Sequence, residues 1–77
     1  MPVMKYGYII WNPSVSRPDI RYEDGTFYGG LHCGNTFEVL IKDKWQPTRI
    51  EYRHSMDTWY LVGVENGDEI LWMTVRK

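Results

Sequence analysis

Hydrophobic residues recur at every second position through much of this 77-residue chain, and this period limits its fold more than any other feature. Successive side chains of a β-strand point to opposite faces, so a period of two predicts strands that bury one face. The alternating positions are Phe37, Val39 and Ile41; Thr48, Ile50 and Tyr52; Trp59 and Leu61; and Ile70 and Trp72.

Residues typical of tight turns separate these segments. Asp24-Gly25 lies between residues 20–23 and 26–28 and predicts a two-residue hairpin. Asp43-Lys44 separates the middle pair of strands, and Asn66-Gly67-Asp68 separates the last pair. No stretch between the breaks is long enough for a stable helix. We therefore expect an all-β fold of about five to six short strands, either a small SH3-like barrel or a strongly bent antiparallel meander.

Length and charge narrow the class of protein further. The chain is long enough for one domain, residues 1–77, and no more. Ten acidic and nine basic side chains give a net charge of −1, which argues against a general nucleic-acid binder. The single cysteine excludes an internal disulfide and fits a reducing cytoplasm. The longest apolar run, residues 59–64, is too short to span a membrane.

The segment 31–35, Leu-His-Cys-Gly-Asn, concentrates metal-ligand chemistry beside several glycines. A sharp turn there would let His32 and Cys33 face one ion, and the turn at 53–57 adds His54 and Asp57. Zinc takes four such ligands, so we hypothesise a zinc site from these residues, or an ion shared between two chains with fewer ligands from each. In the competing interpretation Cys33 is a small buried residue and the histidines are solvated, because the spacing matches no standard zinc motif.

The same residues offer a weaker case for catalysis. Cys33 with a histidine, oriented by Asp57, has the residue types of a nucleophile and its base. A barrel of this size has little room for a concave pocket, and the chain has no phosphate-binding glycine loop or paired carboxylates. We expect no enzymatic activity and assign no catalytic residue.

Aromatic side chains make up 16% of the residues, more than so small an interior holds. Several of them are therefore expected on the surface, where Trp, Tyr and Arg anchor protein interfaces. A face with Arg49, Arg53 and Tyr60 would also stack single-stranded bases. The balanced charge favours a protein partner over a nucleic acid.

Four strings in the chain resemble a family of small proteins of unknown function. They are LHCG at 31–34, FEVL at 37–40, WQPTRIEY at 45–52 and WYLVG at 59–63. Proteins of that family are carried by plasmids, conjugative elements and phages of Gram-positive bacteria. The resemblance covers about residues 22–64, most of the chain, and implies no established activity or catalytic residue. It implies a mobile-element context, in which small proteins act against host defence, and this suits an anti-CRISPR inhibitor.

We therefore expect a non-enzymatic inhibitor in the host cytoplasm that binds a type II CRISPR effector nuclease, or another host defence protein, and blocks DNA loading. The alternative is an SH3-like accessory module that binds single-stranded nucleic acid or another protein during transfer of a mobile element. The chain is expected to be a monomer or a metal-linked dimer. The residues expected to bind the partner are Trp45, Arg49, Arg53 and Tyr60, with an acidic tip of Glu65, Asp68 and Glu69 that steers toward a basic channel.

Overall fold

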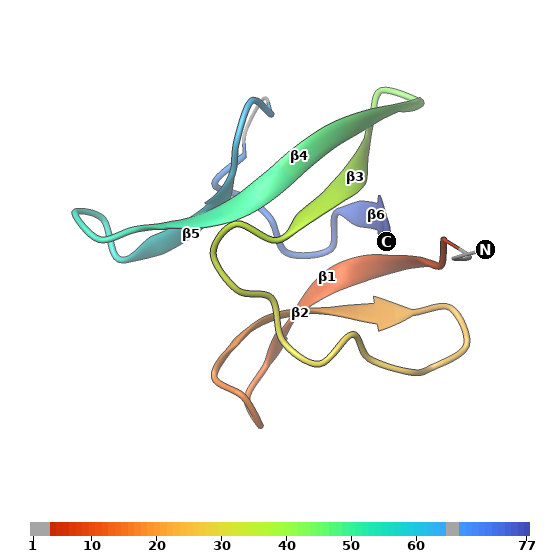
Figure 1. Ribbon diagram of the computed structural model, residues 1–77, viewed down its shortest axis with the longest axis horizontal. Coiled ribbons are helices and arrows are strands. Elements are labelled where there is room, and N and C mark those ends of the chain that lie inside the picture. Colours follow the sequence, from red (N-terminus) through yellow and green to blue (C-terminus); the bar gives the residue numbers. More distant parts are fainter. Residues whose placement is uncertain (1–3, 65–66) are drawn as a thin grey trace.

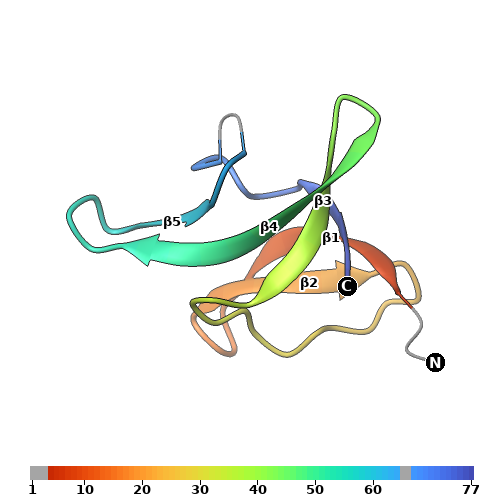
Figure 2. The same cartoon turned by 45° about the horizontal axis from the view of Figure 1, so that its top comes forward.

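The computed structural model describes residues 4–64 and 67–77 as one antiparallel sheet with no helix (Figure 1). The strands run in the order β2-β1-β6-β3-β4-β5. The all-β expectation is therefore confirmed. The last strand does not extend the meander, because β6 lies between the β1–β2 hairpin and the β3–β4–β5 unit (Figures 1 and 2). The strands are β1 (Tyr6–Asn12), β2 (Arg17–Tyr22), β3 (Thr36–Ile41), β4 (Lys44–Arg53), β5 (Thr58–Leu61) and β6 (Thr74–Arg76).

The sheet is strongly bent, and its two outermost strands approach each other through side chains. In the described parts of the chain, β2 and β5 do not pair. The Arg17 guanidinium instead lies over the Trp59 ring, 5.8 Å from its centroid. The connection from β2 to β3 lies along this open side: Leu31 N–H donates to the Pro18 carbonyl at 2.8 Å. No helix among the described residues is long and apolar enough to cross a membrane.

Tight turns set the register of the hairpins. Lys42 and Asp43 have φ of 49° and 65°, the left-handed conformation that a two-residue turn needs between right-twisted strands. This turn therefore lies one residue earlier than the sequence predicts. The predicted hairpin turn at Asp24-Gly25 forms with three residues instead of two, because Tyr22 N–H donates to the Thr26 carbonyl at 2.8 Å and residues 23–25 make the loop. The chain that follows makes a single bridge to β2 and no further strand.

The core confirms most of the predicted alternation. Phe37, Val39, Ile50 and Leu61 are buried as expected. The prediction that Ile70 and Trp72 share a strand face is wrong, because residues 68–73 form no strand and Trp72 is 69% exposed at φ of 71°. A left-handed residue interrupts the alternation there. The buried hydrophobic residues are Ile9, Ile20, Tyr22, Leu31, Phe37, Val39, Ile50, Leu61, Ile70 and Val75.

Asp19 is a fully buried carboxylate in β2 that fixes the chain after that strand. Its Oδ1 accepts hydrogen bonds from the N–H groups of Ile20, Gly29 and Gly30 at 2.8, 2.9 and 2.8 Å. Its Oδ2 accepts one from Asn12 Nδ2 at 2.9 Å. Burial by itself raises the pKa of Asp19, but these bonds outweigh burial and lower the pKa below its usual value. Gly29 and Gly30 have φ of 113° and 107°, where other residues are strained, so the glycine pair lets two successive N–H groups face one oxygen.

Candidate binding surface

Stacked aromatic and arginine side chains cover the face of the sheet that is turned away from the core. We call this the outer face. Its members alternate with buried residues along each strand, and the strand register places Tyr8 opposite Arg21, Arg76 opposite Tyr6 and Glu38, and Tyr60 opposite Glu51. The outer face includes Tyr6, Tyr8, Arg21, Glu38, Trp45, Arg49, Glu51, Arg53, Tyr60 and Arg76.

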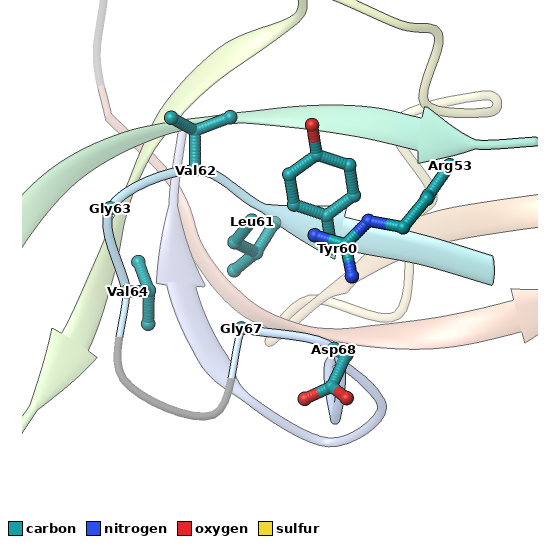
Figure 3. A pocket seen from close by; sticks show the side chains of 8 residues that line it. All are labelled: Arg53, Tyr60, Leu61, Val62, Gly63, Val64, Gly67 and Asp68. Atoms are coloured by element: carbon teal, nitrogen blue, oxygen red, sulfur yellow. The ribbon is translucent and has the colours of Figure 1, made fainter. Parts of the chain in front are cut away.

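Arg53 and Tyr60 form the contact that best matches the sequence prediction. The Arg53 guanidinium lies over the Tyr60 ring, 4.4 Å from its centroid, and Arg53 is exposed at the end of β4. Both side chains border an open hollow of about 640 Å³, with Asp68 across the hollow from them (Figure 3). The hollow therefore joins two residues of the predicted partner surface to one residue of the predicted acidic tip.

Trp45 lies at the other end of β4 in a second stacked cluster. The Tyr6 and Trp45 ring centroids are 5.7 Å apart, and the Arg76 guanidinium lies 4.4 Å from the Trp45 centroid. Arg76 Nε also donates to Glu38 Oε1 at 2.9 Å, and this hydrogen bond raises the pKa of Arg76. Each ring and the guanidinium thus has a partner on a different strand.

The predicted partner residues share one face but not one cluster. Arg49 lies between the two ends of β4 and pairs with Glu51 at 3.0 Å. Trp45 and Arg53 are eight positions apart on one strand, which corresponds to about 26 Å. Arg49, Arg53 and Tyr60 are therefore close enough to meet one small epitope, whereas Trp45 requires a partner that covers the length of β4.

The acidic tip divides between two surfaces. Asp68 and Glu69 are both exposed, and Glu65, the third predicted member, lies outside the described residues together with Asn66 of the predicted turn. Asp68 borders the hollow of Arg53 and Tyr60. Glu69 borders a different hollow, between Trp11 and Trp59, which Asp68 also reaches.

Three of the four predicted zinc ligands border one open hollow of about 420 Å³. His32, Cys33 and His54 line it, together with Trp59 and other residues, whereas Asp57 does not. Cys33 is exposed, so it is not a small core residue. Across residues 4–64 and 67–77, no three His, Cys, Asp or Glu side chains are arranged to hold a metal ion. The zinc hypothesis therefore continues as the proposal that two chains share an ion.

Sequence reasoning missed the part of the outer face that β1 contributes. Tyr8 packs against Trp72 with ring centroids 5.3 Å apart, and Arg21 donates to the Tyr8 hydroxyl at 2.6 Å. The available signal was the Tyr-Gly-Tyr alternation at 6–8. Gly7 lies between the two tyrosines on the opposite face, where a Cβ atom would collide with the backbone carbonyl of Arg21.

The fold and this surface define a small all-β domain with a stacked aromatic and arginine face. Residues 7–77 match the family described as a domain of unknown function, DUF5348, and the chain belongs to this family. It is similar to a protein from Ruminococcus gnavus with a crystal structure, at 41% sequence identity and a TM-score of 0.80. That match covers 95% of this chain and 100% of the other. No curated protein matches the chain.

Proposed function

We propose that this domain is a non-enzymatic binding protein that docks a partner protein on its outer face. The observation that carries the proposal is the Arg53–Tyr60 stack beside an open hollow. Arg and Tyr are enriched among interface hot spots, and side chains that are already stacked lose little rotamer freedom when a partner binds. The Trp45 cluster at the other end of β4 would extend the same interface.

In its specific form, the proposal makes the partner a type II CRISPR effector nuclease in the cytoplasm of the host, with the bound domain blocking DNA loading. This form is supported by the sequence resemblance to proteins of mobile elements and phages. The exposed carboxylates Asp68 and Glu69 suit it, because a basic nucleic-acid channel attracts acidic side chains beside the docking face.

An order-of-addition experiment tests this form. Purified type II effectors are mixed with the domain before or after target DNA, and cleavage is measured over time. Inhibition only when the domain is added first supports a block of DNA loading. An absence of inhibition in both orders, across several effectors, contradicts a CRISPR nuclease as the partner and leaves the docking face to be tested with other host defence proteins.

One observation favours a second candidate, a module that binds single-stranded nucleic acid. Among the outer-face residues named above, arginines outnumber carboxylates, although the whole chain has a net charge of −1. Base stacking on aromatic rings beside arginines is how such modules bind. Fluorescence anisotropy with a labelled oligothymidine at rising salt separates the two candidates, because phosphate contacts impose a steep loss of affinity with salt. No measurable binding at low salt contradicts this second candidate.

A further inference from the structure

The second site of interest is an apolar hollow of about 300 Å³ at the open side of the bent sheet, apart from the outer face. We propose that this hollow binds an arginine or lysine side chain of a partner protein. This inference does not depend on the proposed docking at the outer face. The residues that line it include Trp11, Pro18, Trp59, Asp68, Glu69 and Leu71.

The walls of the hollow are apolar and partly open to solvent. Trp11 is 48% exposed at the end of β1, and Leu71 is 50% exposed on the connection to β6. Trp59 is half-buried on β5, and Pro18 is buried at the start of β2. Two indole rings with aliphatic neighbours match the methylene stem of a long basic side chain, which covers apolar surface while its charged head stays in water.

Trp59 already accepts one guanidinium from this chain, on the neighbouring side. Arg17 lies 5.8 Å from the Trp59 centroid and donates to the Leu31 carbonyl at 3.1 Å. Arg17 lines the adjoining hollow of His32 and Cys33 and does not line the hollow of Trp11. The Trp11 side is therefore not occupied by this arginine.

The charges on the rim favour a positively charged occupant. Asp68 and Glu69 are exposed, and among the described residues no Lys or Arg lies within ion-pair distance of either. A cation beside the tryptophans gains from the negative ring faces and from both carboxylates. A phosphate or an acidic peptide would be repelled by the same carboxylates. Charge and surface together thus favour a basic side chain.

The four tryptophans make a direct test, because each gives its own indole N–H signal in ¹⁵N-correlated NMR spectra. The probe is Nα-acetylarginine methylamide, and its uncharged control is the citrulline analogue. We expect the arginine probe to shift the signals of Trp11 and Trp59 at concentrations that leave Trp45 and Trp72 unchanged. We expect the citrulline probe to bind about five- to tenfold more weakly.

A rim variant and a control outside the hollow test the role of the rim carboxylates. The double variant Asp68→Asn/Glu69→Gln should weaken arginine binding about fivefold, whereas Asp43→Asn, at the β3–β4 turn and not in the lining of the hollow, should leave it unchanged. Three results overturn the proposal. They are equal binding of the arginine and citrulline probes, shifts at all four tryptophans together, or shifts of Trp11 and Trp59 with protein concentration alone, which would identify a second copy of the chain as the occupant.

Discussion

Asp19→Asn tests whether one buried carboxylate holds the connection between β2 and β3. Asn keeps the shape of the side chain and one oxygen that can accept from Ile20, Gly29 and Gly30. In the wild-type protein, Asn12 Nδ2 donates to Asp19 Oδ2 at 2.9 Å. The substitution removes the negative charge and places a second amide donor opposite Asn12 Nδ2. Each of the bonds to the carboxylate weakens by about 1 kcal/mol, and relief from burying a charge offsets part of that loss. We expect a net loss of about 2 kcal/mol in the free energy of unfolding.

Urea unfolding followed by tryptophan fluorescence measures this loss. A change of about 2 kcal/mol is large in a domain whose length corresponds to a total stability of about 4–12 kcal/mol. The matched control is Asp43→Asn, which removes an exposed carboxylate at a turn and should change stability by less than about 0.5 kcal/mol. An Asp19→Asn variant as stable as the control would refute the account of this connection.

The pH dependence gives the same test a second readout. The pKa of Asp19 is lower in the folded than in the unfolded chain, so its carboxylate adds stability that is fully present above the unfolded value of about 3.9. That stability is lost as the pH falls through the folded pKa. The difference between wild type and Asp19→Asn should therefore be largest at neutral pH and shrink below about pH 4. Asp24, whose pKa is lowered by its bonds to Thr26, is present in both proteins, so its effect cancels.

Three further predictions concern packing, stacking and metal. Gly7→Ala should lower the free energy of unfolding by about 1–3 kcal/mol, because the new methyl group would collide with the Arg21 backbone. An unchanged urea midpoint would contradict this prediction. A double-mutant cycle of Arg53→Ala and Tyr60→Ala should give a coupling of about 0.5–1 kcal/mol in stability, and additive effects would mean that the stack contributes nothing. A chelator should leave the melting temperature of the domain unchanged, because in the two-chain proposal no single chain holds the ion. Added zinc should produce dimers in sedimentation experiments, and Cys33→Ser should abolish them. Monomers at all zinc concentrations would contradict the metal hypothesis.

The alternation of hydrophobic residues predicted which side chains within a strand are buried. Phe37, Val39 and Ile50 are buried because a period of two fixes which side chains share a face. Trp72 fits the same pattern but is exposed, because its left-handed backbone interrupts the alternation. A run of apolar residues gives no sign of that backbone conformation. Asp19 gave no signal, because the glycine N–H groups that satisfy its carboxylate lie ten and eleven residues further along the chain.

The candidate surface divides in the same way. Arg53 and Tyr60 were predicted on one face from their own strands, and β4 and β5 pair directly. The cluster of Tyr6, Trp45 and Arg76 was not predicted, because it depends on β6 returning to the middle of the sheet. Such long-range pairing leaves no trace in the spacing of residues along a single strand.

The central claim is that the outer face docks a partner protein, and the most direct test compares two variants in the effector cleavage assay. Arg53→Ala/Tyr60→Ala removes the stack, whereas Lys44→Ala removes one exposed positive charge at the start of β4. We predict that the double variant remains folded and inhibits about ten- to a hundredfold less well than wild type, and that Lys44→Ala inhibits as well as wild type. Equal inhibition by the folded double variant and by wild type would contradict the claim, whereas no inhibition by either would exclude the tested nucleases as the partner.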